Sequence, residues 1–290
     1  MIAISGASGQ LGKLVIEALL QHLDAENIVA LARQPEKLEA LRAQGVEVRH
    51  ADYNKPQTLA PALAGIDQLL LISGSEVGQR VAQHSAVIEA ARAAEVSHLV
   101  YTSILKADSS PLILAQEHRE TEAMIKTSGL IYTLLRNGWY SENYTSTLAG
   151  ALDAGVLCSA AGQGKLHSAA RADYAAAAAE VLRNSAQHRN KTYELAGSSG
   201  FTLQAYAALA ADLSNSALDY REMNREEFSA LLVQFGLPES FAAVLADAEI
   251  GIANGWLEEA GGELAALIGR ATTPIESSIA AALEQRATSY

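Results

Sequence analysis

Short apolar runs alternate with longer amphipathic segments along the first half of the chain. Most of the runs are rich in Val, Ile and Leu, which is typical of parallel strands covered on both faces. The segments between them have the length and periodicity of helices. Strands separated by helices in this way predict right-handed crossovers and an α/β fold with a doubly wound parallel sheet. The strands are predicted for the run that starts at Met1 and for residues 28–32, 46–50, 67–72, 98–102 and 131–135.

Turn residues mark the helices that connect these strands. Pro35 is a good first helical residue and Gly45 is a typical residue just after a helix, so a helix is predicted between them. After Arg136 the pattern becomes mainly helical, with a Gly-rich, hairpin-like stretch at 162–165 and a short strand at 191–195. The other helices are predicted near 56–64, 78–95, 113–128, 143–154, 172–182, 202–213, 224–235, 238–253 and 273–286.

The first strand runs directly into a glycine-rich turn. Gly6, Gly9 and Gly12 form a Gly-x-x-Gly-x-x-Gly pattern between this strand and a helix. In a dinucleotide site the first glycine makes the tight turn, the second lets the backbone approach the pyrophosphate, and the third lets the helix pack closely. The helix N-terminus adds partial positive charge. Glycines at this spacing also occur in ordinary turns, but the strand before and the helix after favour a dinucleotide site.

These patterns predict a Rossmann-type nucleotide-binding domain over residues 1–140, completed by about 170–196. Residues 141–169 and 197–290 are interpreted as a smaller, mainly helical C-terminal lobe that caps the substrate pocket. Ligands of doubly wound sheets bind beyond the carboxyl ends of the strands. The segments expected to share that edge are 5–12, 33–34, 52–53, 73–79, 103–108 and 136–144.

The composition excludes several classes of protein. Hydrophobic residues make up 49% of the chain and charged residues 19%, which is typical of a globular protein. A net charge of −12 argues against nucleic acid as the main partner. Since no apolar run approaches the roughly 20 residues of a membrane helix and no signal peptide precedes the first strand, we expect a cytoplasmic protein without membrane insertion. The single cysteine, Cys158, is compatible with a reducing compartment and is interpreted as a small core residue.

The residue at the end of the second predicted strand bears on the choice of cofactor. An NAD site usually has a carboxylate there for the ribose 2′-hydroxyl, whereas this chain has Arg33. A guanidinium suits a 2′-phosphate by charge and geometry, so NADP(H) is favoured over NAD(H), although a solvated arginine at a helix start is the simpler alternative. Asp52 and Tyr53 are candidates to border the adenine, and a helix N-cap by Asp52 or Asn54 is the competing role.

The catalytic apparatus of ordinary hydroxyl dehydrogenases is missing from the sequence. Such enzymes use a tyrosine with a lysine four residues later, whereas Tyr132 is followed at that offset by Arg136 and Tyr140 by Tyr144. This weighs against alcohol–ketone chemistry, which needs a tuned acid. The reduction of quinones and conjugated dyes depends less on such an acid, because delocalisation stabilises the reduced product. Neither a His-x-x-x-His pair nor a Gly-x-Ser-x-Gly elbow occurs, so no metal site or serine hydrolase is expected.

The stretch 136–144, directly after the sixth predicted strand, is dense in aromatic and amide side chains. Asn137 is a candidate to bind a carboxamide, and Trp139 or Tyr140 to stack on an aromatic acceptor. A capped helix start with packing aromatics is the alternative.

Four segments together, 6–12, 71–80, 101–103 and 134–144, resemble the NmrA-like atypical short-chain dehydrogenases/reductases. The likeness extends over nearly the whole chain and includes 171–174 and 194–197. Within this family the chain is more similar to the bacterial NADPH:quinone oxidoreductases than to the triphenylmethane reductases.

The resemblance implies a Rossmann domain with a small C-terminal lobe, NADPH as cofactor without flavin or metal, and hydride transfer to a quinone. It also implies that Arg33 binds the 2′-phosphate, and that Gly74 stands where a serine is expected, with the loss of one hydroxyl contact. Tyr140 is the candidate proton donor. The cofactor-binding residues carried over by position are Gly6, Ala7, Ser8, Gly9, Gln10, Leu11, Arg33, Ser73, Gly74, Ser75, Asn137, Gly138, Trp139, Tyr140, Ser141, Glu142 and Arg171.

Two alternatives remain open at this point. NmrA-like proteins include regulators that bind NADP(H) and report redox state without turnover. A reductase of triphenylmethane or azo dyes is the other alternative, because dyes and quinones are both planar and conjugated. The sequence is compatible with an oligomer and does not define its size.

Overall fold

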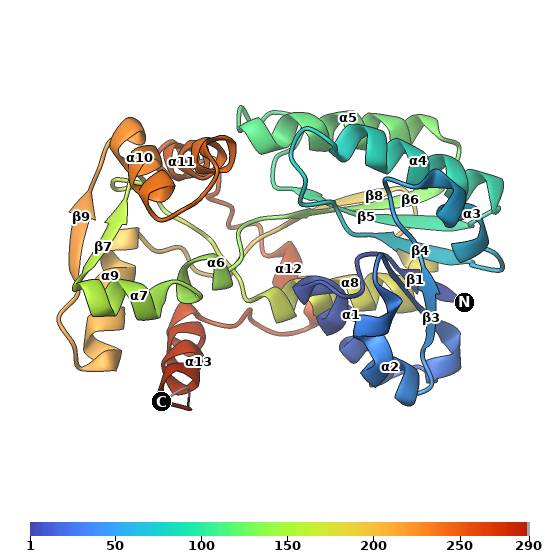
Figure 1. The fold of residues 1–290 in the computed structure, drawn as a ribbon, viewed down its shortest axis with the longest axis horizontal. Helices are drawn as coiled ribbons and strands as arrows, with labels where there is room; N and C mark the ends of the chain where they lie inside the picture. The colour runs from blue at the N-terminus through green and yellow to red at the C-terminus, as the bar shows by residue number, and fades with distance from the viewer. Residues whose placement is uncertain (289–290) are drawn as a thin grey trace. The chain divides into compact units, whose positions relative to one another are not determined.

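The computed structural model describes residues 1–288 and divides into two compact units, each built from separate segments of the chain (Figure 1). The first unit comprises Met1–Asp108, Ala115–Asn137 and Arg171–Tyr193. The second comprises Ser109–Leu114, Gly138–Ala170 and the chain from Glu194 onward.

The first unit is organised around a sheet of seven strands in the order β3-β2-β1-β4-β5-β6-β8. Neighbouring strands from β3 to β6 pair in parallel, which confirms the predicted doubly wound sheet. The strand order reverses between β1 and β4, and this reversal is the position where open α/β sheets bind ligands. The strands are β1 (Ile2–Ile4), β2 (Ile28–Ala32), β3 (Glu47–His50), β4 (Gln68–Leu71), β5 (His98–Ile104), β6 (Ile131–Asn137) and β8 (Lys191–Leu195).

Helices cover both faces of this sheet, with α3, α4 and α5 on one side and α1, α2 and α8 on the other (Figure 1). Alternate residues of the strands, such as Ala3 and Leu69, are fully buried in a core with Val87 and Ile88 of α4. On the opposite face, the alanine-rich α8 packs against α1. The small side chains of α8 allow this close approach because they occupy little space between the helices. The helices are α1 (Gln10–Leu20), α2 (Glu39–Ala43), α3 (Leu59–Ala62), α4 (Arg80–Ala93), α5 (Ile113–Thr127) and α8 (Arg171–Arg183).

The second unit is mainly helical, and a pair of short parallel strands, β7 and β9, forms its small sheet. Helix α10 begins with a capping box, in which Asn224 and Glu227 satisfy each other's backbone N–H groups. Within residues 1–288, no helix combines the length and apolarity needed to cross a membrane. The elements are α6 (Glu142–Thr145), α7 (Leu148–Ala154), β7 (Val156–Ser159), α9 (Leu203–Ser214), β9 (Asp219–Glu222), α10 (Arg225–Gln234), α11 (Glu239–Ala253), α12 (Glu263–Ile268) and α13 (Ile275–Thr288).

Several expectations for the second unit were wrong. The stretch 162–165 is not a hairpin, because the strand before it, β7, pairs in parallel with the distant β9. The helix predicted at 143–154 is two helices, α6 and α7. Cys158 is half-buried rather than a core residue, because Leu157 and Ser159 occupy the buried face of β7.

Three histidines of the first unit are buried with hydroxyl partners. His84 Nδ1 lies 2.9 Å from Thr121 Oγ1, and His98 Nε2 lies 2.8 Å from Thr133 Oγ1. The third, His118, has its Nδ1 2.7 Å from the hydroxyl of a buried tyrosine on β5. Burial lowers the pKa of His84 to about 3 and that of His98 to about 4, and it holds the pKa of His118 well below its usual value. All three are therefore neutral in the folded protein near pH 7.

We expect the free energy of unfolding to decrease as the pH falls from about 7 to 5. The unfolded chain binds protons on these histidines below pH 6.5, the ordinary histidine pKa, whereas the folded chain keeps them neutral. Urea unfolding across this pH range measures the slope. His98→Gln keeps a donor for Thr133 and removes one titrating group, so its slope should be shallower. Equal slopes for His98→Gln and the unmodified protein would contradict this explanation.

Candidate cofactor-binding site

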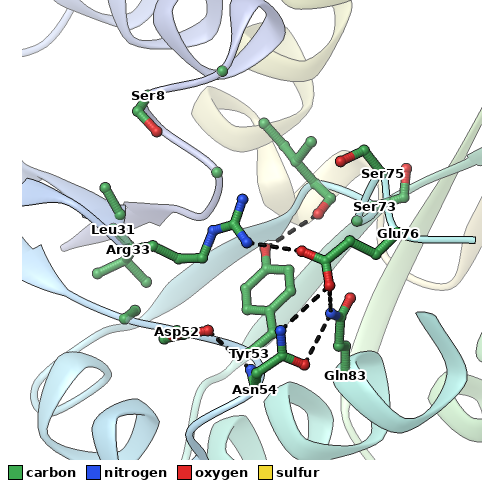
Figure 2. Close-up of a pocket in the computed structure, with 16 residues that line it drawn as sticks. Ser8, Leu31, Arg33, Asp52, Tyr53, Asn54, Ser73, Ser75, Glu76 and Gln83 are labelled. Carbon is green, nitrogen blue, oxygen red and sulfur yellow. Dashed lines mark hydrogen bonds and ion pairs between the residues drawn. The ribbon is translucent and has the colours of Figure 1, made fainter. Parts of the chain in front are cut away.

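A cavity of about 260 Å³ lies at the carboxyl ends of the central strands of the first unit (Figure 2). Its walls come from the turn after β1 and from the segments that follow β2, β3 and β4, which confirms that these segments share one edge of the sheet. The lining residues are Gly6, Ser8, Gly9, Leu31, Ala32, Arg33, Ala51, Asp52, Tyr53, Asn54, Ile72, Ser73, Gly74, Ser75, Glu76 and Gln83.

The glycine turn forms one wall of this pocket. Gly6 has a φ of 60°, in the left-handed region that favours glycine. The Gly9 N–H donates to Gly6 O over 2.9 Å, and Gly9 is the N-cap of α1. Because glycine has no capping side chain, the first N–H groups of α1 remain suited to phosphate oxygens. A Cβ on Gly12 would lie 2.5 Å from Gly6 O, so only glycine permits this approach of the helix to the turn.

Tyr53 follows the edge strand β3 and links the ends of β1 and β4 at the pocket. Its hydroxyl lies 2.5 Å from Ser5 Oγ and 3.1 Å from Ile72 O, and Ser5 Oγ also accepts the Ile72 N–H over 2.9 Å. Burial raises the pKa of Tyr53 to about 12, so the phenol stays protonated near pH 7. These contacts hold the ends of β1 and β4 at a fixed spacing around the cavity.

The alternative role of Asp52 or Asn54 as a helix N-cap was wrong. The 3₁₀ turn that begins at Pro56 has Lys55 as its N-cap, without a side-chain hydrogen bond. Asp52 instead accepts the Asn54 N–H at its Oδ1 over 3.0 Å, which closes an Asx turn within the pocket wall. Both side chains are thereby positioned at the cavity.

The segment after β4 is held by groups on the neighbouring elements. The Ser73 N–H donates to Thr102 Oγ1 over 2.9 Å, and the Gly74 N–H donates to His84 Nε2 over 3.0 Å. The Arg80 Nε donates to Gly74 O. Because His84 accepts at Nε2, its proton is on Nδ1, and burial keeps the ring in this neutral form. Hydrogen bonds with side chains on the neighbouring elements therefore hold this part of the pocket wall in place.

Gly74 has a consequence beyond a lost hydroxyl contact. A Cβ at this position would lie 2.8 Å from Gln83 Oε1, closer than a normal contact allows. Gln83 occupies the space that a serine side chain at position 74 would need. The glycine therefore lets the buried Gln83 reach the pocket, where its Nε2 donates to Glu76 Oε2 over 2.9 Å.

Glu76 is a pocket residue that the sequence analysis did not single out. Its Oε1 accepts from Arg33 Nη1 over 2.8 Å, and its Oε2 accepts from Asn54 Nδ2 over 3.3 Å (Figure 2). The hydrogen bonds from Asn54, Gln83 and Arg33 lower the pKa of the Glu76 carboxyl against the effect of burial. The available signal was its position in the segment 73–79, on the ligand edge of the sheet.

The structure brings many of the predicted cofactor-binding residues to one pocket. Gly6, Ser8, Gly9, Arg33 and Ser73–Ser75 line it directly. Ala7, Gln10 and Leu11 belong to the same turn and the first residues of α1. Arg171, the first residue of α8, donates to the Gln10 side chain.

The remaining predicted residues follow β6. Asn137 is the last residue of this strand in the first unit, and its carbonyl accepts the Leu105 N–H over 3.0 Å. Gly138, Trp139, Tyr140, Ser141 and Glu142 belong to the second unit. There the Trp139 carbonyl accepts the N–H of Ala169 over 3.1 Å, and the Ser141 N–H donates back to the Ala169 carbonyl over 2.9 Å. Tyr140 is thus held between two backbone hydrogen bonds, with its side chain half-buried.

Comparison with known proteins identifies the family to which this chain belongs. The sequence pattern of the NAD(P)H-binding family matches residues 6–185. Quinone oxidoreductase 2 of Escherichia coli (strain K12) is 51% identical over 279 residues, which make up 96% of this chain and 97% of that protein. The chain therefore belongs to the NAD(P)H-binding family and, within it, to the NmrA-like proteins.

Solved structures agree with this assignment. The crystal structure of the Escherichia coli NADPH-dependent quinone oxidoreductase QOR2 complexed with NADPH is similar with a TM-score of 0.94 and 50% identity, covering 98% of this chain and 100% of that chain. The Citrobacter sp. triphenylmethane reductase complexed with NADP(H) is similar with a TM-score of 0.92 and 37% identity, covering 97% and 100%.

Proposed function

We propose that the chain is an NADPH-dependent quinone oxidoreductase that transfers a hydride directly to a quinone without flavin. The observation that carries this proposal is the pocket, in which the glycine turn, the N-terminus of α1 and Arg33 face one cavity. The relative with 51% identity over nearly the whole chain supports the same acceptor class.

In this proposal, different segments of the chain bind different parts of the cofactor. The turn from Gly6 to Leu11 binds the pyrophosphate through the backbone N–H groups at the start of α1, since this helix has no N-cap side chain in their place. Arg33 binds the 2′-phosphate, and Asp52 and Tyr53 border the adenine side of the pocket. Ser73, Gly74 and Ser75 line the path toward the nicotinamide. A pocket wall that is already hydrogen-bonded loses little conformational entropy on binding.

Bound NADPH supplies a hydride from C4 of its nicotinamide. With one proton from solvent, NADPH and a quinone give NADP⁺ and a hydroquinone, so both electrons arrive with the hydride. Asn137 orients the carboxamide, and Trp139 stacks on the acceptor, in this proposal. Tyr140 is the proposed proton donor, with the phenol proton replaced from water. Glu142, Ser141, Gly138 and Arg171 complete the proposed cofactor contacts.

A second candidate acceptor is a triphenylmethane or azo dye. The triphenylmethane reductase of Citrobacter sp. is 37% identical with a TM-score of 0.92, and an NAD(P)H azoreductase of Xenophilus azovorans is 28% identical over 243 residues. Dyes and quinones are both flat conjugated rings that an aromatic stretch can bind. Parallel assays of one quinone and one dye with NADPH distinguish the two acceptors by their kcat/KM values.

Arg33→Glu is expected to raise the KM for NADPH by roughly ten- to a hundredfold, about 1.4–2.8 kcal/mol of lost binding. The substitution replaces a cation by an anion opposite the 2′-phosphate, whereas the KM for NADH should change little. The loss of reduced-nicotinamide absorbance with a simple quinone measures both constants. Arg42→Glu, on the exposed surface of α2, makes the same charge change outside the pocket and serves as the control.

Three results would each contradict part of the proposed function. An unchanged NADPH KM in Arg33→Glu would remove the assignment of that arginine. Tight NADPH binding with no turnover of quinones or dyes would instead indicate a nucleotide-sensing regulator. A visible flavin spectrum in the purified, active protein would exclude direct hydride transfer as the mechanism proposed here.

A further inference from the structure

The ion pair between Arg33 and Glu76 joins opposite walls of the pocket. Arg33 follows β2 and Glu76 lies in the segment after β4, and these two strands flank β1. Figure 2 shows the arginine side chain reaching across the cavity to the carboxylate, with Nη1 and Oε1 2.8 Å apart. The pair therefore spans the region where the sheet order reverses, which is the part of the fold that binds the dinucleotide.

Glu76 is the fixed side of this pair. Its second oxygen accepts from Gln83 Nε2 and Asn54 Nδ2, and these two amides are themselves joined by a 3.1 Å hydrogen bond. Gln83 is buried, and Gly74 leaves the space that its amide occupies. A carboxylate with two amide donors has less freedom to follow a moving partner. When the pair separates, Arg33 is thus the side chain that moves.

Arg33 is the mobile side and carries two competing roles. Its side chain is 62% exposed, and Glu76 is its one ion-pair partner within residues 1–288. The same guanidinium is the group proposed above to bind the 2′-phosphate. A phosphate and a carboxylate that share one guanidinium repel each other. The 2′-phosphate therefore gains less binding energy from Arg33 than it would in the absence of Glu76.

We propose that the Arg33–Glu76 pair is a latch across the cofactor pocket and that Glu76 thereby sets the affinity for nicotinamide cofactors. The pair spans the crevice and must open when a dinucleotide enters. The 2′-phosphate of NADPH then gives Arg33 a new ionic contact. NADH also breaks the Arg33–Glu76 ion pair but offers Arg33 no phosphate in its place. This inference rests on NADP(H) binding in the pocket, as proposed above.

Equilibrium binding of NADPH and of NADH to the full chain tests the latch, with fluorescence or calorimetry as the readout. Glu76→Gln removes the charge and keeps an oxygen for the amide donors. We expect it to tighten the binding of both cofactors by about two- to fivefold, the range of exposed ion pairs. The gain should shrink at high salt, where the latch is already screened. Glu89→Gln, an exposed glutamate on α4, makes the same charge change away from the pocket and should alter neither Kd.

The double variant separates a latch from a general charge effect. In an Arg33→Ala background no latch exists, so adding Glu76→Gln should leave the Kd for NADH unchanged. Circular dichroism and thermal unfolding verify that each variant is folded. If Glu76→Gln is not folded, Glu76→Asp is used instead, since its shorter side chain withdraws the carboxylate from Arg33 and should change both Kd values in the same direction.

Weaker NADPH binding in Glu76→Gln would overturn the latch, because it would mean that Glu76 positions Arg33 for the phosphate. Unchanged Kd values for both cofactors would overturn it as well. Failure of the unmodified protein to bind NADPH would instead contradict the proposed function, so the two failures are distinguishable.

Discussion

Alanine in place of Gly12 is expected to reduce NADPH binding by more than a hundredfold and to destabilise the first unit by about 1–3 kcal/mol or more. A Cβ there would lie 2.5 Å from Gly6 O and 2.8 Å from Ala7 Cα, and both are backbone atoms that cannot rotate away. Helix α1 must therefore move off the glycine turn, which misplaces the N–H groups proposed to bind the pyrophosphate. Equilibrium binding and urea unfolding measure the two effects.

Two other glycines provide matched controls for this prediction. A Cβ on Gly9 would lie 3.1 Å from the same Gly6 O, so Gly9→Ala requires only a small shift and should have a smaller effect. Gly150, inside α7, has no atom within 4 Å of an added Cβ. Gly150→Ala should stabilise the protein slightly, by about 0.5–1 kcal/mol, because alanine favours the helix. Normal NADPH binding by Gly12→Ala would contradict the assigned role of the turn.

Glu122→Gln is expected to lower the free energy of unfolding by about 3–5 kcal/mol, because it leaves the buried charge of Arg136 without its main partner. Arg136 makes two hydrogen bonds to this carboxylate, with Nε 2.9 Å from Oε1 and Nη2 2.7 Å from Oε2. Both side chains are at most 5% exposed. Burial alone raises the pKa of the Glu122 carboxyl. Hydrogen bonds from Arg136 and Ser103 and the charges of Arg136 and Lys126 together outweigh burial and hold that pKa below its usual value, so the carboxyl is ionised at pH 7.

The double variant Glu122→Gln/Arg136→Met should recover most of this loss. It removes both charges together, and buried ion pairs are often replaced by apolar side chains without a net cost. Glu120→Gln changes an exposed glutamate on the same helix and serves as the control in urea unfolding at pH 7. A double variant as unstable as Glu122→Gln alone would show that the loss does not come from an uncompensated charge.

The sheet could be predicted from the sequence because its central strands are apolar throughout. All five residues of β2, Ile28–Ala32, are buried, and such a run has few alternatives to a covered parallel strand. The strand β9 gave no such signal, since Asp219–Glu222 is mostly polar and largely exposed. Its pairing with β7 is a tertiary contact between segments far apart in the chain. Local pattern therefore identified the strands of the larger sheet and missed both strands of the smaller one.

The cofactor pocket shows the same division between local and tertiary information. The glycine turn and Arg33 carry their chemistry in their own sequence context, and both line the cavity. The network of Glu76, Asn54 and Gln83 depends on three segments that meet only in the folded unit. An acidic residue beside an arginine that is proposed to bind a phosphate also runs against simple charge reasoning, so sequence alone gave no reason to choose Glu76. The roles of residues 137–142 remain predictions.

The order in which the first unit's segments occur along the chain has a consequence for synthesis on the ribosome. Strand β8 and helix α8 lie in or next to the segment Arg171–Tyr193, after the chain has passed through Gly138–Ala170 of the second unit. Until α8 and β8 emerge, the face of α1 that α8 covers is exposed, and the edge of β6 that pairs with β8 is open. The nascent protein thus passes through a stage with an open sheet edge and an uncovered apolar surface, at which holding chaperones would be expected to bind.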